Sequence, residues 1–175
     1  MNKKFITIVA LIALAAISRF LPFAPNFSPM GAIALFAGAF IANRYLAIGL
    51  PLIALFISDF FVGFYGAGMI PVYGCIALFG VIGMFVTNKN NPISILGSSL
   101  LGSIAFFLIT NCVFLYTADN TFYPTNFSGL LQSYYAGLPF FKNALQGDLL
   151  FTAILFGSYY LLSVNVPFLK EEKAS

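Results

Sequence analysis

Residues 92–116 read PISILGSSLLGSIAFFLITNCVFLY, and no charged residue interrupts them. A helix needs about 20 apolar residues to cross the hydrocarbon core of a bilayer, and this stretch is longer than that. Asn91 followed by Pro92 is typical of a helix start, with an N-cap side chain and then a proline at the first helical position. The stretch therefore predicts a membrane-spanning helix.

The composition of the whole chain supports the same conclusion. Only 7% of the 175 residues are charged, against about 25% in soluble domains, and 61% are hydrophobic. So few charges could not cover the surface of a soluble domain of this size. We therefore predict an all-α, polytopic membrane protein that is surrounded mainly by the lipid bilayer. The chain length leaves no room for a separate catalytic domain.

Charge-free stretches divide the chain into six predicted spans within one transmembrane domain, residues 1–175. Their expected ranges are 4–21, 29–42, 45–64, 71–87, 92–116 and 143–164. A polar and aromatic segment, 117–137, is expected to hold a short helix from Ser128, with the sixth span starting between Pro139 and Asp148. The N-terminus also resembles a secretory signal, with Lys3 and Lys4 before an apolar run, but we expect an uncleaved first helix because that run continues to Leu21.

The distribution of Lys and Arg sets the expected orientation. With both ends in the cytoplasm, six of the eight basic residues lie inside, and only Arg19 and Lys142 lie outside. The six are Lys3, Lys4, Arg44, Lys89, Lys170 and Lys173. This predicts a six-helix bundle with an N-in, C-in topology.

Several polar residues are expected at the outer ends of different spans. They are Arg19, Asp59, Asn111 and Asp148, with Asn26, Lys142 and Asn143 in adjoining loops or helix ends. Charged groups within a bilayer normally face a partner or a water-filled cavity. Two interpretations stay open: a polar pocket that opens to the outside, and structural pairs such as Arg19 with Asp59 or Asp148.

Aromatic residues cluster in the outer loop region around Tyr123. They indicate either an interfacial aromatic belt or a lid over a planar ligand. Ala34, Gly38 and Ala42 form a stripe of small residues that predicts close helix packing, with a surface for a partner as the alternative. Cys75 and Cys112 are expected to be inert buried thiols, with a disulfide or a soft metal ligand as alternatives.

Missing residues exclude several function classes. The chain has no His, and it lacks the glycine-rich phosphate-binding loop of ATPases. Its basic residues are scattered, which argues against nucleic acid as a partner. We predict no catalytic residues, no metal, no cofactor and no enzymatic activity.

The run RFLPFAPNFSP at residues 19–29, followed by GAIALFAGAFI, resembles a bacterial family of integral-membrane transport proteins. Further matches are Ser58-Asp59, Thr110-Asn111 and the stretch from Gly129 to Asp148. That family is similar to the substrate-binding S components of energy-coupling factor (ECF) transporters. The resemblance implies a six-helix N-in, C-in fold and a small-molecule substrate, vitamin-like or another nutrient, bound near Asp59, Asn111 and Asp148.

The resemblance also implies a gating loop formed by Pro22, Pro25, Phe27 and Pro29. It implies a partner as well, a transmembrane coupling subunit with ATPases. The Ala-x-x-x-Ala docking face usual on the first helix of S components is not evident here, because Ala10 meets Leu14 and Ala15 meets Arg19.

Capture of a small solute for uptake is therefore the leading functional hypothesis. A structural or assembly scaffold of the cell envelope and a small integral-membrane enzyme are the alternatives.

Overall fold

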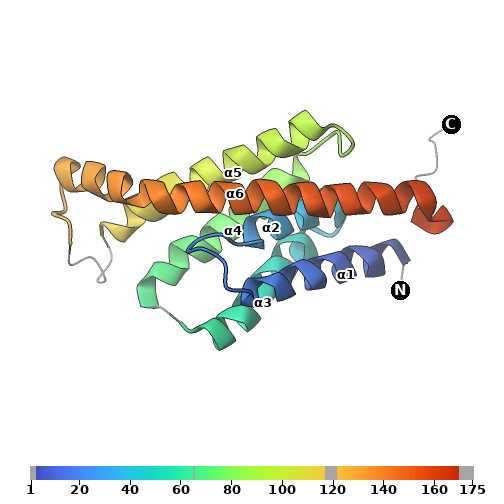
Figure 1. Ribbon diagram of the computed structural model, residues 1–175, viewed down its shortest axis with the longest axis horizontal. Helices are drawn as coiled ribbons and strands as arrows, with labels where there is room; N and C mark the ends of the chain where they lie inside the picture. Colours follow the sequence, from blue (N-terminus) through green and yellow to red (C-terminus); the bar gives the residue numbers. More distant parts are fainter. Residues whose placement is uncertain (1–2, 65, 117–121, 170–175) are drawn as a thin grey trace.

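The computed structural model describes residues 3–64, 66–116 and 122–169, and these residues form helices and connecting loops with no strand (Figure 1). The helices are α1 (Lys3–Ile17), α2 (Met30–Phe40), α3 (Arg44–Val62), α4 (Met69–Met84), α5 (Pro92–Phe114) and α6 (Phe127–Asn165). Short 3₁₀ turns cover Ser18–Phe20, Gly66–Gly68 and Pro167–Leu169. The predicted all-α class is confirmed for this part of the chain.

Four helical segments are long and apolar enough to cross a membrane. They are Arg44–Val62, Gly66–Met84, Pro92–Phe114 and Phe127–Asn165. Large apolar side chains on these segments are exposed, among them Phe60, Phe61, Ile70, Ile93 and Leu161. Such broad apolar exposure fits a surface that faces lipid rather than water. These helices are those of a membrane protein.

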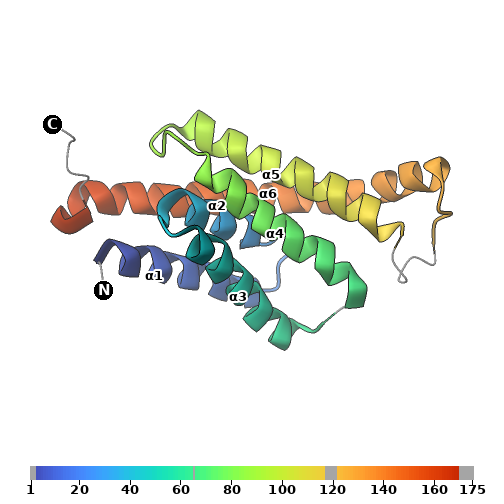
Figure 2. The ribbon, with the colours of Figure 1, turned by 180° about the vertical axis from the view of Figure 1, so that it is seen from behind.

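Helix α2 forms the centre of the bundle and contacts each of the other five helices (Figures 1 and 2). Its residues from Met30 to Ala39 are all buried. At 11 residues it is about 16 Å long, roughly half the thickness of the hydrocarbon core. The predicted span 29–42 is thus a short helix enclosed by protein, and its apolar residues face other helices on every side.

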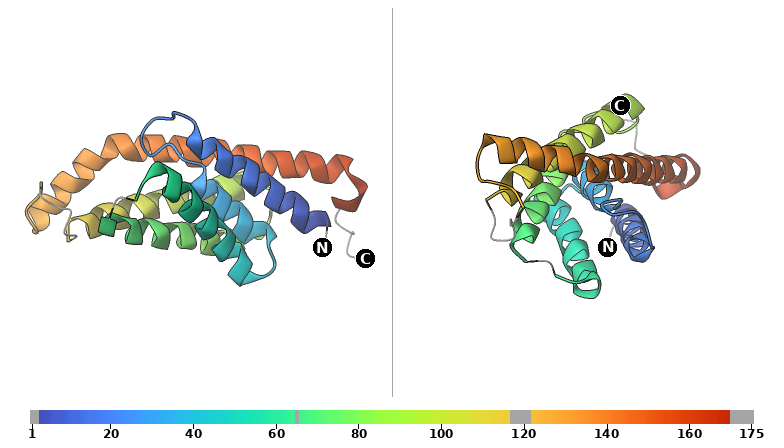
Figure 3. Two further views of the ribbon diagram at one scale, coloured as in Figure 1. Left: turned by 90° about the horizontal axis from the view of Figure 1, so that it is seen from below. Right: turned by 60° about the vertical axis from the view of Figure 1, so that its left-hand side comes forward.

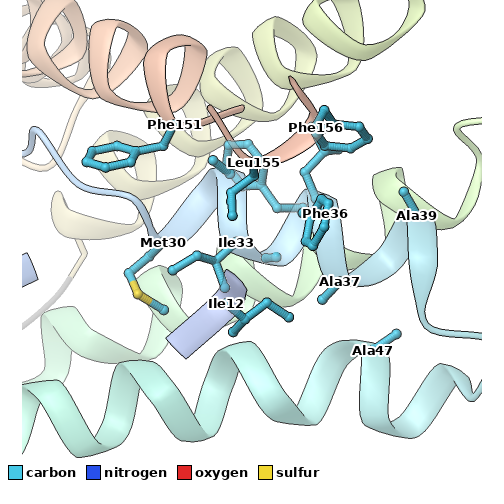
Figure 4. Close-up of a cluster of buried hydrophobic side chains, with 14 of the residues drawn as sticks. Ile12, Met30, Ile33, Phe36, Ala37, Ala39, Ala47, Phe151, Leu155 and Phe156 are labelled. Atoms are coloured by element: carbon cyan, nitrogen blue, oxygen red, sulfur yellow. The ribbon is translucent and has the colours of Figure 1, made fainter. Parts of the chain in front are cut away.

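The hydrophobic core surrounds α2, as Figure 4 shows. Phe36 of α2 packs edge-on against Phe156 of α6, with ring centroids 5.3 Å apart and an interplanar angle of 84°. Ile12 of α1 and Ala47 of α3 close the core from the other side. Contacts from three neighbouring helices hold α2 in the middle of the molecule.

Glycines allow α2 and α4 to pack backbone to backbone. A β-carbon at Gly38 would collide with the carbonyl oxygen of Gly80, and one at Gly83 would collide with the carbonyl oxygen of Leu35. Ala34 is fully buried near this contact. Ala42 lies beyond the end of α2 and is exposed, so the small-residue stripe in the helix ends at Gly38.

Asparagine side chains cap three of the helices. Asn43 accepts hydrogen bonds from the backbone N–H groups of Tyr45 and Leu46, at 3.0 and 3.3 Å. Asn91 accepts one from Ile93, and Asn126 one from Gly129, both at 3.0 Å. These bonds satisfy N–H groups that have no partner within the helix, which explains where α3, α5 and α6 begin.

Helix α6 differs from the expectation. It runs without interruption from Phe127 to Asn165, so the separate helix from Ser128 and the later start between Pro139 and Asp148 are wrong. The predicted span 143–164 lies within this helix. Pro139 is accommodated inside it, and the amino-terminal part bends away from the rest (Figure 3). Proline lacks an N–H group and bends a helix without always ending it, which sequence patterning did not resolve.

The start of α1 and the end of α6 lie at the same end of the bundle (Figures 1 and 2). This agrees with an even number of helices that alternate in direction. At this end, the Lys89 ammonium group lies 5.2 Å from the centroid of the Phe40 ring, and Arg44 begins α3. Lys170 and Lys173, which also entered the predicted topology, lie outside the described residues.

Candidate functional site

A cavity of about 470 Å³ lies at the end of the bundle opposite the start of α1, which we call the cavity end. Its walls come from the 3₁₀ turn after α1, the loop 21–29, the start of α2 and helices α3 to α6. Its polar lining residues are Arg19, Asn26, Ser28, Thr110 and Asp148, and its apolar ones include Leu55, Ile76, Phe79 and Phe106. The start of α2 therefore lies at a cavity that reaches deep into the bundle.

The loop 21–29 lines this cavity and is fastened to α6. In the ribbon, the loop passes beside α6 (Figure 3). The side-chain amide of Asn143 donates a hydrogen bond to the carbonyl oxygen of Pro25 at 3.0 Å. The loop also passes close to Gly147, where a β-carbon would lie 2.9 Å from the backbone nitrogen of Ser28. Asn26 adopts a left-handed conformation with a φ of 64°, which asparagine tolerates better than most residues.

Of the expected gating residues, Phe27 lines the cavity. Its ring centroid lies 5.0 Å from that of Phe23 and 6.0 Å from that of Phe151 on α6. Pro22 and Pro25 shape the loop without lining the cavity, and Pro29 precedes the first residue of α2. An aromatic cluster thus lies beneath the loop.

Arg19 and Asp59 form an ion pair beside the cavity. Nη2 of Arg19 lies 2.5 Å from Oδ1 of Asp59. This oxygen is held by the ion pair alone, because it accepts no well-aligned hydrogen bond from the described residues. The hydroxyl of Tyr73 donates to Oδ2 of Asp59 at 2.8 Å. Asp59 is completely buried, whereas the side chain of Arg19 is 17% exposed and lines the cavity. Asp59 therefore holds Arg19 in position without itself facing the cavity.

Arg19 has two more partners on α3. Its Nη1 atom donates to the carbonyl oxygen of Leu55 at 3.3 Å and to the hydroxyl of Ser58. A guanidinium group carries five N–H donors in a fixed plane, so these contacts fix its orientation. Of the structural pairs left open by the sequence, the structure contains the one between Arg19 and Asp59.

Asp148 lines the cavity from the middle of α6 and is 7% exposed. Its Oδ2 atom accepts a hydrogen bond from the hydroxyl of Ser103 on α5 at 2.7 Å. Its Oδ1 atom lies against Gly31 of α2, so closely that a β-carbon at that position would collide with it. No basic side chain among the described residues forms an ion pair with Asp148.

Buried hydroxyl groups extend from Asp148 along the contact between α5 and α6. Ser103 Oγ also lies 3.0 Å from the carbonyl oxygen of Ser99, and Thr152 donates to the hydroxyl of Ser99 at 3.2 Å. Ser99, Ser103 and Thr152 are each at most 1% exposed. Ser99 and Ser103 therefore form a polar contact with α6.

The amino-acid sequence matches a family model described as a family of unknown function (DUF6580) over residues 1–169. The chain belongs to the DUF6580 family. No curated protein and no solved structure matches it. The family description names no activity, so the expected likeness to ECF S components stays a prediction for this DUF6580 chain.

A second cavity of about 310 Å³ adjoins the first and shares Asn26, Phe106, Thr110 and Ala144 with it. Asn111 of the DUF6580 chain lines this second cavity beside Gly137. Its side-chain amide donates to the carbonyl oxygen of Phe107 in the same helix at 2.8 Å. Asn111 is thus near the main cavity but not in its wall.

The structure therefore separates the predicted site residues of this DUF6580 chain into three groups. Arg19, Asn26 and Asp148 line the main cavity, and Asp59 and Asn111 lie behind or beside it. Asn143 fastens the loop, and Tyr123 lines neither cavity.

Sequence reasoning missed the small residues of the site, chiefly Ser28, Gly31, Ser103 and Thr110. Ser103 and Thr110 lie within apolar helices, and only the packing of the helices shows that they face inward. Gly31 follows the proline that precedes α2, but nothing in its sequence context indicates a carboxylate nearby. Cys75 and Cys112 are both free thiols. Within the described ranges, no group of three or more His, Cys, Asp or Glu residues could hold a metal ion.

Proposed function

We propose that this protein is a bacterial inner-membrane transport protein that captures a small solute from the outer face for uptake. The observation that carries the proposal is the cavity of about 470 Å³ at the cavity end. Its volume lies within the range of small-molecule sites, and mostly apolar walls with a few polar groups are typical of such sites.

The way the cavity is covered supports capture rather than a purely structural role. One loop, 21–29, supplies Leu21, Phe23, Ala24, Asn26, Phe27 and Ser28 to the lining. Within the described residues, that loop is held to α6 by one side-chain hydrogen bond, from Asn143, by close packing at Gly147 and by the ring contacts of Phe23 and Phe27 with Phe151. A loop attached by few polar contacts can open at low cost, as gating of a binding site requires.

The source of energy is part of the proposal. S components dock on a transmembrane coupling subunit with ATPases, but the first helix here lacks their usual alanine face. We therefore propose a dedicated partner, or uptake by this protein alone, and expect no enzymatic activity of its own.

Native mass spectrometry of the gently purified full chain tests the function. We expect a small molecule to co-purify with the wild type and to be lost from Gly31→Leu, whose side chain would push against Asp148 and Phe79 in the cavity wall. Gly49→Leu is the matched control, because nothing lies within 4 Å of a β-carbon at Gly49 in α3. It should retain the solute.

The alternative function, a scaffold of the cell envelope, predicts a different result in the same experiment. An envelope scaffold would be recovered with a protein partner and an empty cavity, and Gly31→Leu would leave that partner in place. This result would overturn the transport proposal.

A further inference from the structure

The cavity has one more carboxyl group beside it than it has basic partners. Arg19 carries one positive charge, and Asp59 neutralises it directly at 2.5 Å. Asp148 supplies a second carboxyl group, and no described basic residue pairs with it. The nearest base along α6, Lys142, is exposed and does not line the cavity. The walls therefore leave one carboxyl group, that of Asp148, without a basic partner among the described residues.

The two oxygens of Asp148 have different surroundings. Oδ2 accepts the hydrogen bond from Ser103, which orients the carboxylate without neutralising it. Oδ1 lies beside the α-carbon of Gly31 and receives no hydrogen bond from the described residues. Because Gly31 has no side chain, this second oxygen stays reachable from the cavity.

The rest of the lining favours the same kind of ligand. Phe27, Phe79 and Phe106 supply aromatic rings to a wall that is otherwise largely apolar. Aromatic faces attract cations, and most strongly where water is excluded. An anion, in contrast, would meet the acidic side chain of Asp148 in a poorly solvated space and find Arg19 already paired with Asp59.

We propose that the solute carries a cationic ammonium-type group, which pairs with Oδ1 of Asp148, and an apolar body that contacts Phe79 and Phe106. This inference rests on the proposed function and specifies its substrate class as small organic cations. A buried carboxylate is stable when it is paired and hydrogen-bonded, and the bound cation would supply the missing partner.

Three probes of similar size but different charge test the inference: 2-phenylethylammonium, 2-phenylethanol and phenylacetate. Their dissociation constants are measured from the concentration dependence of the melting temperature of the purified full chain. We expect the cation to bind at least about tenfold more tightly than the alcohol, which corresponds to about 1.4 kcal/mol, and phenylacetate to bind most weakly.

Variants of Asp148 test whether its side chain causes the preference for the cation. Asp148→Asn should abolish the preference for the cation over the alcohol, whereas Asp148→Glu should retain part of it. Tyr45→Phe, an exposed position at the other end of the bundle, is the control and should behave as the wild type. If Asp148→Asn fails to fold, the binding of the three probes to the wild type and to Asp148→Glu still tests the charge preference.

Contrary results separate this inference from the proposed function. Tighter binding of phenylacetate, or an unchanged cation preference in Asp148→Asn, would overturn the charge assignment while solute capture remained supported. If none of the probes binds, the net charge of the solute that co-purifies decides the matter, and a neutral or anionic solute overturns the inference. Absence of both probe binding and a co-purifying solute would instead overturn the proposed function.

Discussion

Arg19 and Asp59 face each other between the end of α1 and α3, with Nη2 2.5 Å from Oδ1 and with Asp59 completely buried. We expect Asp59→Asn to destabilise the protein, because it leaves the guanidinium group of Arg19 without its counter-charge. Breaking a buried pair costs about 3–5 kcal/mol, and the partial exposure of Arg19 places this case at the lower end. Thermal unfolding of the purified variant measures the loss.

The double variant Arg19→Gln with Asp59→Asn is the decisive comparison. Neutralising both partners should recover most of the lost stability, since no unpaired charge remains. If Asp59→Asn is as stable as the wild type but no longer retains solute, Asp59 belongs to the binding site, and the structural role assigned here is wrong.

Gly38→Ala should loosen the contact between α2 and α4. The added β-carbon would overlap with the carbonyl oxygen of Gly80, so the two backbones would have to separate, at a cost of about 1–3 kcal/mol. Gly49→Ala, in an open position inside α3, should instead be neutral or stabilising by up to about 1 kcal/mol. Parallel thermal unfolding of both variants checks this, and equal melting temperatures would contradict the close packing.

Asn143→Leu should free the loop 21–29 while leaving the helical bundle intact. It removes the hydrogen bond to the carbonyl oxygen of Pro25, and the partial exposure of that bond limits the stability loss to about 1.5 kcal/mol. Hydrogen exchange of residues 21–29 should become faster. Gln132→Leu serves as the control, because Gln132 bonds only within α6, and it should leave exchange of the loop unchanged.

Cysteine labelling tests the orientation predicted from the Lys and Arg distribution. In a variant without Cys75 and Cys112, Asn90→Cys at the turn before α5 should react only after the membrane is permeabilised. Gln132→Cys, exposed near the start of α6, should react in intact cells. The reverse pattern would place the cavity at the inner face and contradict capture from outside.

Most helices could be predicted from the sequence because a lipid bilayer constrains the backbone in a simple way. Backbone groups in a bilayer must be paired within the helix, so uninterrupted apolar runs such as 92–116 become helices, and Asn91 with Pro92 shows where one begins. The same rule does not show which runs are enclosed by protein. The apolar residues of α2 face other helices, whereas those of α3 at Phe60 and Phe61 are exposed, although both segments are predominantly apolar.

The site was predicted in part, for a different physical reason. Charged residues are rare in this chain, so Arg19 and Asp148 stood out, and both line the cavity. Their partners depend on how the helices turn about their axes: Asp59 faces Arg19, and Ser103 faces Asp148. If a helix were rotated about its axis by the angle between two successive residues, different side chains would face each other. A single sequence carries no signal for this rotation.

The shortness of α2 determines how far a captured solute would still have to travel. Met30 and Gly31, the first residues of a helix only about 16 Å long, line the cavity. If the other end of α2 lies at the inner boundary of a bilayer core about 30 Å thick, this floor of the cavity would lie near the mid-plane. A solute on that floor would already have crossed half of the hydrophobic barrier. The remaining half is closed by α2 and its glycine contacts with α4, and a passage there would require those two backbones to part.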